Sequence, residues 1–422
     1  MSNSKFSKNL LAALMCGNML EYFDFFIFAH FTFLLAPKFY PAINPMFDSI
    51  VAGFFFAIGF LARPVGGYFF GRIADFTGRS RSLMFSVLGM AIPTLCIGLL
   101  PTYAEVGIVA PIALITCRVI QGLCMGGEFT NGGVLLIESY GWNRAGAVAG
   151  FYNFSSGMGS LLAIACVAVV SSPGMPEWSW RIPFVIAAFL GVVAYYLRSY
   201  INESPVFEHE SRIRSADALK LSDVKHGKFF ARAFCTGAIA GVFIWIPLSF
   251  TSFYMTKILS IPLHIAVKMT VLAVILHSAF TAIFGWLSDR VGWKNMMITG
   301  CLVQMALLYP AFSLLYDKQF IMFQVLMVIP AAMTYAVLHP LGSFEVPALL
   351  RGRLSGFALS SGLCIFAGLT PLITSSLTQL MSGNLFGVMA YLFAVSFLGM
   401  LMIHWLYRPT KNSDKVEFRL VA

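Results

Sequence analysis

The segment "FGRIADFTGR" at residues 70–79 joins two long apolar stretches, and it decides how the 422-residue chain is interpreted. A near copy, "FGWLSDRVGW", stands at residues 284–293. In the first copy, Gly71 and Gly78 allow a tight turn and a close approach of two helices. An acid followed by a basic residue, repeated between apolar stretches, predicts a hairpin that sits at one face of a membrane.

Other elements repeat at nearly the same interval, between 205 and 214 residues further along the chain. They are Glu138 with Arg144 against Glu345 with Arg351, and "SSG" at 155–157 against 360–362. Three matches at one interval indicate a duplicated six-helix unit. Duplicated halves around a central site are typical of secondary transporters.

The amino-acid composition is that of a membrane protein. Of the residues, 59% are hydrophobic and 11% are charged, and the mean hydropathy is +0.81. Apolar stretches of about 20 residues are long enough to cross a bilayer core of ~30 Å. We therefore predict an all-α membrane protein with twelve spans, at 10–36, 49–70, 83–101, 107–137, 146–171, 180–201, 229–255, 266–287, 296–316, 320–341, 354–381 and 385–407.

The longest polar gap, at residues 203–228, divides the spans six and six. We predict six-helix bundles at 1–202 and 229–422, joined by this linker. With the N-terminus inside, the inner segments carry 21 Lys and Arg and the outer segments carry 5. Since basic residues stay on the cytoplasmic side, both termini and the linker should be cytoplasmic.

Several other classes of protein are excluded. The eight Cys show no metal or redox spacing, and all fall in apolar spans, where they pack as small residues. The net charge of +10 comes from short scattered loops, which does not suggest nucleic-acid binding. Nucleophile-elbow, HExxH and phosphate-loop motifs are missing from the sequence, so we expect neither an enzyme nor an ATP-driven pump, and no cofactor or metal.

The stretch from Gly71 to Leu83 resembles the loop signature of the major facilitator superfamily. A narrower resemblance is to its metabolite:proton symporter branch, which includes proline/betaine and dicarboxylate permeases. It rests on "GNMLEYFDF" (17–25), "RPVGGYFFGRIADFTGR" (63–79), "RVIQGLCMGGE" (118–128), "WRIPF" (180–184) and "INESPVF" (201–207). The start of the chain also resembles amino-acid permeases of intracellular proteobacteria. The resemblance implies a multi-pass protein of the bacterial inner membrane.

The repeat and the loop positions predict a gate on the cytoplasmic side. We expect Asp75 to pair with Arg144, and Asp289 to pair with Arg351, as the two bundles close. The full set of expected gate residues is Asp75, Arg79, Glu138, Arg144, Asp289, Glu345 and Arg351.

Five charged residues lie well inside the predicted spans rather than near their ends, namely Glu21, Asp24, Glu128, Arg63 and Arg118. Each costs roughly 3 kcal/mol or more to insert into a membrane, so such residues usually serve function. Counting residues from the span ends predicts that Glu21, Arg63 and Glu128 lie in one layer, with Arg63 between the acids. We expect Glu128, then Asp24, then Glu21 to carry a proton. The alternative is that all five only pair to hold helices together.

The function predicted from the sequence is proton-coupled import of a small polar metabolite, such as an amino acid or betaine, by a monomer in the lipid bilayer. Arg118 is expected to bind a substrate carboxylate, and Glu21 or Asp24 a substrate ammonium. The predicted substrate-binding set is completed by Gln121, Asn153, Tyr254 and Tyr335, with Trp245 and His339 as further pocket candidates, while Gly122 and Gly126 pack helices closely. Two alternatives stay open, a carboxylate or carboxylate-siderophore transporter and an uncoupled uniporter.

Overall fold

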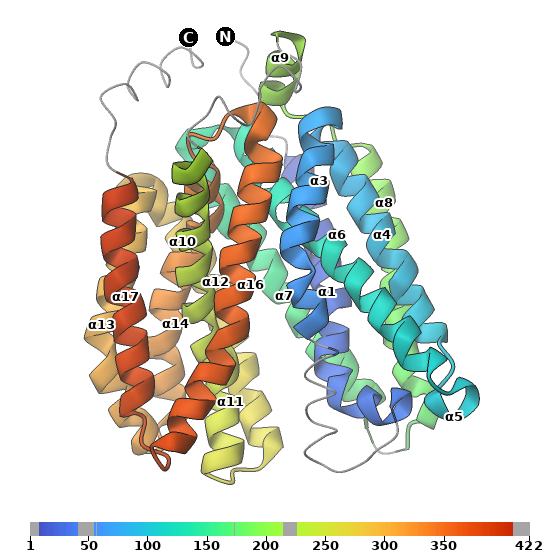
Figure 1. Cartoon of the computed structure of the whole chain (residues 1–422), viewed down its shortest axis with the longest axis vertical. Coiled ribbons are helices and arrows are strands. Elements are labelled where there is room, and N and C mark those ends of the chain that lie inside the picture. The colour runs from blue at the N-terminus through green and yellow to red at the C-terminus, as the bar shows by residue number, and fades with distance from the viewer. Residues whose placement is uncertain (1–7, 41–54, 56, 173, 214–225, 408–422) are drawn as a thin grey trace.

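The computed structural model describes residues 8–40, 55, 57–172, 174–213 and 226–407. Within these residues all regular structure is helical. Figure 1 shows two groups of helices side by side, with α1 to α8 in one group and α10 to α17 in the other.

The first group and the helix that follows it have these bounds: α1 (Lys8–Phe39), α3 (Arg63–Thr77), α4 (Arg79–Leu99), α5 (Tyr103–Val106), α6 (Val109–Tyr140), η1 (Trp142–Arg144), α7 (Ala145–Val170), η2 (Glu177–Arg181), α8 (Ile182–Ser199) and α9 (Pro205–Ile213). Helix α9 lies at the end of the molecule shown uppermost in Figure 1. Hence the α9 end is the side on which the predicted linker begins, and residues 214–225 of that linker lie outside the described part.

The second group has these bounds: α10 (His226–Trp245), η4 (Ile246–Phe250), α11 (Thr251–Phe253), η5 (Tyr254–Ile258), α12 (Leu263–Val291), α13 (Trp293–Tyr316), α14 (Phe320–Ala336), α15 (Leu338–Ser343), α16 (Ala348–Leu380) and α17 (Phe386–Leu406). The η4 and η5 segments are short π-helical turns that widen the continuation of α10. Pro247 lies at the start of η4, and since proline lacks an N–H, the regular helix loosens there.

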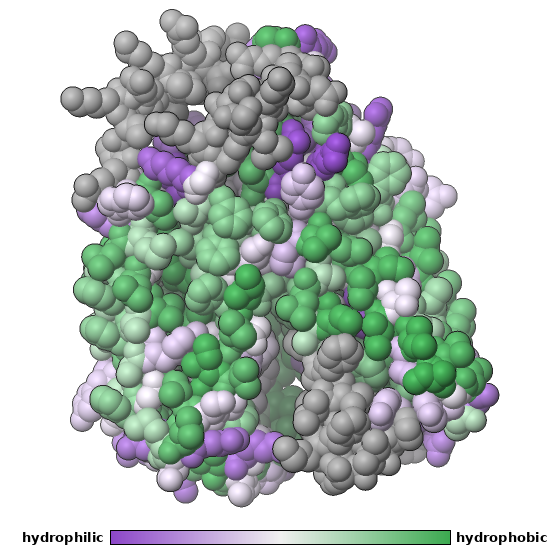
Figure 2. Space-filling model, in the orientation of Figure 1, coloured by the Kyte–Doolittle hydropathy of each residue, from purple (hydrophilic) through white to green (hydrophobic). Residues whose placement is uncertain are grey.

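Eleven helices among the described residues are long and apolar enough to cross a membrane. The predicted span at 49–70 falls partly outside the described residues, so the twelfth span stays a prediction. Figure 2 shows an apolar surface over the middle of the molecule and hydrophilic residues concentrated towards the two ends. This distribution matches a bilayer around the middle and water at the ends.

Several helices begin or end further out than the sequence predicts. Helix α4 begins at Arg79, α16 begins at Ala348, and α6 continues to Tyr140. Glu138 and Arg351 are therefore helical residues rather than loop residues. The reason is that a helix does not stop at the edge of an apolar stretch when its charged residues find partners on neighbouring helices.

Across the boundary between the groups, α3 packs against α16 and α7 packs against α12. Glycines make these approaches close. A side chain added at Gly71 would collide with the backbone of Gly352, and one added at Gly285 would collide with the backbone of Gly146. The two groups therefore touch backbone to backbone towards the α9 end.

Candidate functional site

A cavity of about 380 Å³ lies between the two groups of helices. It is lined by Tyr22, Phe26, Ala29, His30, Phe60, Arg63, Ser160, Ile164, Ile244, Trp245, Leu248, Ser249, Thr270, Val274, Tyr335, Leu363 and Ala367. On α1, α7 and α16 these residues lie away from the helix end nearest α9. The cavity, called the central pocket below, therefore extends from mid-molecule towards the opposite end, where Figure 2 shows a recess between the groups.

Arg63 is the only permanently charged residue among the described residues that line the central pocket. Its guanidinium carbon lies 4.3 Å from the ring centre of Phe25 and 4.0 Å from that of Phe60. One nitrogen donates to the sulfur of Met125 at 2.8 Å, and Nε has no hydrogen-bond partner. No carboxylate of the described residues lies within ion-pairing distance, so Arg63 is a buried cation held by aromatic faces.

The inner end of the central pocket is closed by contacts between the two groups. The hydroxyl groups of Tyr22 and Tyr335 lie 3.4 Å apart. Asn153 donates to the backbone carbonyl of Tyr335 at 3.0 Å, and its side-chain oxygen lies 3.2 Å from Nε2 of His339. The ring of Phe129 packs against His339, with centres 4.5 Å apart. A molecule in the pocket reaches the α9 end only if this layer separates.

Helix α1 turns its acids away from the central pocket. Asp24 accepts a hydrogen bond from Thr94 at 2.5 Å and one from Gln121 at 3.4 Å. Gln121 in turn accepts one from Arg118 at 2.8 Å. The predicted substrate ligands Arg118, Asp24 and Gln121 thus form one buried network inside the first group, and none of the three lines the pocket.

Glu128 pairs with an arginine other than the predicted Arg63. It forms a short ion pair with Arg198 of α8 and accepts a hydrogen bond from Ser86 at 2.7 Å. The sequence prediction that Arg63 bridges Glu21 and Glu128 is therefore wrong. Counting rise along a helix gives depth but not the direction in which a side chain points.

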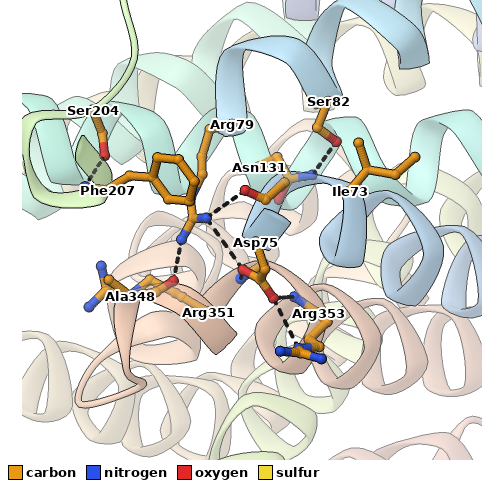
Figure 3. Close-up of polar contacts among 12 residues, drawn as sticks. Ile73, Asp75, Arg79, Ser82, Asn131, Ser204, Phe207, Ala348, Arg351 and Arg353 are labelled. Carbon is orange, nitrogen blue, oxygen red and sulfur yellow. Dashed lines mark hydrogen bonds and ion pairs between the residues drawn. The ribbon is translucent and has the colours of Figure 1, made fainter. Parts of the chain in front are cut away.

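The α9 end is closed by buried ion pairs, shown in part in Figure 3. Glu138 of α6 pairs with Arg351 at 2.6 Å and with Arg79 at 3.4 Å, and it accepts a hydrogen bond from Ser204 at 2.6 Å. Arg79 also donates to the backbone carbonyl of Ala348. These contacts join the first group to the start of α16.

Two aspartates, at equivalent places in the two halves, accept backbone N–H groups across the same boundary. Asp75, at the end of α3, accepts from Gly352 at 2.9 Å and from Arg353 at 3.1 Å. Asp289, at the end of α12, accepts from Gly146 at 2.7 Å and from Ala147 at 2.8 Å, in the first turn of α7. At the start of α7, Asp289 thus satisfies free N–H groups and the helix dipole, whereas Asp75 binds N–H groups in the second turn of α16.

Four of the seven predicted gate residues come together, namely Asp75, Arg79, Glu138 and Arg351, but with partners other than those predicted. Asp75 pairs with Arg79 and Arg353 instead of Arg144, and Arg351 pairs with Glu138 instead of Asp289. The predictions fail because Asp75 and Asp289 recognise backbone N–H groups, which leave no mark on the sequence. Glu345 pairs with Arg232, within the second group, and Arg144 lies exposed before α7.

Some of the other predicted residues line the central pocket, and others pack helices together. Tyr335 and Trp245 line the central pocket, whereas Tyr254, His339 and Asn153 do not. Gly122 lies against the backbone of Gly59, and Gly126 against that of Arg63.

Sequence reasoning missed Arg198 as a partner because it lies near a span end, where arginines usually mark the cytoplasmic side. It also left Arg353 unassigned. Arg198 lies in the last turn of α8, and the sequence gives no signal that its side chain turns towards Glu128.

The model of the Major Facilitator Superfamily matches residues 14–358 of the chain. The proline/betaine transporter of Salmonella typhimurium is 30% identical, with coverage of 94% of this chain and 83% of the relative. The shikimate transporter of Escherichia coli is 29% identical, with coverage of 90% and 89%. A solved structure of the proton:xylose symporter XylE has a TM-score of 0.77 at 16% identity, with coverage of 97% of both chains.

The relatives that are about 30% identical along almost the whole chain are named transporters. The chain is therefore a transporter and not an enzyme. The geometry agrees, since two helix groups enclose one pocket and close it at one end. The chain is a multi-pass transporter of the inner membrane, and it belongs to the major facilitator superfamily, in the branch of the proline/betaine transporters.

Proposed function

We propose that the chain is a proton-coupled symporter that imports a small zwitterion of the proline or betaine kind. The observation that carries the proposal is the environment of Arg63. This buried cation in the pocket wall packs against two aromatic rings and has no carboxylate partner among the described residues. A substrate carboxylate supplies the missing charge and the missing hydrogen-bond acceptor.

Aromatic side chains receive the other end of such a substrate. Tyr22, Phe26 and Trp245 line the same pocket as Arg63, and none of the described lining residues is an acid. A substituted ammonium is well recognised by aromatic faces, which attract a cation without hydrogen bonds. This replaces the sequence-based expectation that Glu21 or Asp24 binds the ammonium, since both lie on another face of α1.

The closed α9 end indicates from which side the substrate enters. The central pocket extends away from α9, while Asp75, Asp289 and Glu138 hold the α9 end shut. We place the α9 end in the cytoplasm on the basis of the Lys and Arg distribution. The structure then corresponds to a state loaded from outside, and release requires the gate contacts and the Tyr22–Tyr335 layer to separate.

A carboxylate that lacks an ammonium group is the second candidate. The pocket wall has a cation and no described acid, and one relative at 29% identity is a shikimate transporter. The aromatic wall favours the zwitterion over this alternative.

The test is competition for binding to the purified protein in nanodiscs, with glycine betaine, proline, shikimate, succinate and choline as competitors. Choline carries the substituted ammonium of betaine but no carboxylate, so it leaves Arg63 unpaired. We expect betaine or proline to bind at least ~10-fold more tightly than choline, and Arg63→Gln to remove that preference. Lys268→Gln, an exposed position on α12, is the control. Equal binding of betaine and choline to the wild type would contradict the assignment, and preference for shikimate alone would favour the second candidate.

A further inference from the structure

A second cavity lies on the other side of α1 from the central pocket. Its volume is about 20 Å³, enough for about one water molecule. Glu21 and Asp24 line it together with Gly17 and Leu20 from α1, Val87, Met90 and Ala91 from α4, and Ala187, Gly191 and Ala194 from α8. Helix α1 therefore presents Tyr22 and Phe26 to the substrate side and two acids to a small, mostly apolar cavity.

Glu21 differs from the other buried acids of the first group. Its exposed fraction is 7%, and neither carboxylate oxygen has a hydrogen-bond partner among the described residues. Asp24, by contrast, accepts hydrogen bonds from Thr94 and Gln121, and Glu128 is paired with Arg198. Since a bare buried carboxylate is strongly disfavoured, Glu21 requires a proton, an ion or a polar ligand.

None of the described charged groups around Glu21 forms an ion pair or a hydrogen bond with it. On its own helix, Asp24 adds a second acid. From α8, Arg198 lies against Gly17, one turn away, but binds Glu128 and the carbonyl of Leu83. From α6, Arg118 donates to Gln121 through Nη1 and is stacked on Phe28, while its Nε and Nη2 have no hydrogen-bond partner among the described residues. Helix α4 brings only apolar residues to the cavity, and the polar groups that α7 presents to α1, Ser155 and Ser156, bind Asn18.

An inventory of buried charges in the first group leaves two residues over. Apart from Asp75, Arg79 and Glu138, which take part in the contacts at the α9 end, the buried acids are Glu21, Asp24 and Glu128 and the buried arginines are Arg63, Arg118 and Arg198. Glu128 matches Arg198 directly, and Asp24 is linked to Arg118 through Gln121. Arg63 and Glu21 remain, and they face different cavities on the two sides of α1.

We infer that Glu21 is the site of the coupled proton, in a cavity separated from the substrate by α1. This inference rests on the proposed function, because it assumes that Arg63 binds the substrate carboxylate. The proton adds to a carboxylate oxygen of Glu21 from the aqueous phase on one side and leaves to the aqueous phase on the other. No other bond forms or breaks.

The arrangement gives a physical rule for coupling. When a substrate carboxylate and a proton are both bound, Arg63 and Glu21 are each compensated. When both are absent, the two residues carry opposite charges that sum to zero. A zwitterion adds no net charge, but its carboxylate pairs with Arg63, so a bound substrate without a proton leaves Glu21 as a bare buried carboxylate when the pocket closes and water leaves. Closure over a bound substrate therefore favours the form in which Glu21 carries the proton.

The experiment compares wild type, Glu21→Gln and Glu208→Gln in proteoliposomes. Glu208 is an exposed acid on α9 and serves as the matched control. Radiolabelled glycine betaine and proline are the probes. An imposed gradient of about one pH unit drives roughly tenfold accumulation at one proton per substrate. We expect this accumulation in wild type and in the control, whereas Glu21→Gln should only equilibrate the probe, while exchange of labelled for unlabelled probe persists within about twofold.

The outcomes separate the inference from the proposed function. If wild type accumulates the probe and takes up protons with it, and Glu21→Gln does the same, the proton site lies elsewhere. If wild type moves the probe without any proton, the proposed coupling itself fails, whatever Glu21→Gln does.

A second measurement does not depend on the folding of a variant. Dicyclohexylcarbodiimide reacts with protonated carboxyl groups in apolar surroundings, and mass spectrometry locates the adduct in the wild-type chain. We expect the adduct on Glu21, with less labelling at high pH and an altered rate when glycine betaine or proline is present. An adduct on Asp24 or Glu128 without one on Glu21, or no adduct on Glu21 at any pH, overturns the assignment.

Discussion

The carboxylate of Asp75 accepts a hydrogen bond from the backbone N–H of Gly352, at 2.9 Å, so the end of α3 is tied to the second turn of α16. Asp289 makes the equivalent contact with Gly146 at the start of α7. Both bonds join a helix of one half to a helix of the other. They must break whenever the α9 end opens, so they bias the equilibrium between two states.

The first prediction concerns Asp75→Asn. The substitution removes the charge from two hydrogen bonds, each worth roughly 1.5–3 kcal/mol, so the population open at the α9 end should rise at least tenfold. A cysteine placed at the buried Ser355, in a cysteine-free background, reports the change through labelling by a membrane-impermeant maleimide from the α9 side. Glu208→Gln is the control, and an unchanged labelling rate in Asp75→Asn would show that Asp75 does not hold the gate.

The second prediction uses two glycines on the same helix. A side chain at Gly356 would meet the backbone of Gly67 on α3, whereas one at Gly368 meets nothing within 4 Å. Gly356→Leu should therefore keep α16 and α3 apart and abolish uptake, with the chain still inserted in the membrane. Gly368→Leu should transport like wild type. Equal uptake by both variants in vesicles would contradict the close packing of α3 and α16.

The third prediction treats Glu128 and Arg198 as a structural pair. Removing either partner leaves the other as an uncompensated buried charge, which costs about 3–5 kcal/mol. Glu128→Gln and Arg198→Gln should each lower the melting temperature of the detergent-solubilised protein, and the double variant should recover part of the loss. If the double variant is as unstable as the sum of the two single variants, the residues do not act together.

The fourth prediction concerns the aromatic wall. Trp245→Leu should raise KM for glycine betaine by about 5- to 30-fold, because a cation–π contact in a desolvated site is worth roughly 1–2 kcal/mol. It should leave shikimate, which has no cation, within about twofold of wild type. Trp286→Leu, an exposed position on α12, is the control. A similar rise for both substrates would mean that Trp245 only shapes the pocket.

Much of the fold could be predicted from the sequence. Long apolar stretches allow little besides membrane helices, and the copies around Asp75 and Asp289 place the two halves in equivalent positions. The gate residues Arg79, Glu138 and Arg351 were also identifiable, because buried charges at span ends need partners. Their pairing was not, since a carboxylate can bind either an arginine or the N–H groups of a helix start.

The site was harder to predict for a physical reason. Helix α1 has apolar residues around its whole circumference and no separate polar face, so its sequence does not reveal which face meets the substrate. Two acids on that helix suggest a binding face, yet Tyr22 and Phe26 line the central pocket and Glu21 lines a cavity on the other side of α1. The roles of Arg63 and Glu21 emerge only when every other buried charge has been matched with its partner.

The most direct measurement of proton-coupled transport is the gradient at which net flux of glycine betaine is zero. In proteoliposomes with the membrane potential clamped at zero, the imposed pH difference is varied against a fixed betaine gradient. The account predicts that about one pH unit balances a tenfold opposing betaine gradient, at one proton per substrate. Flux that always follows the betaine gradient alone, whatever the pH difference, would contradict it.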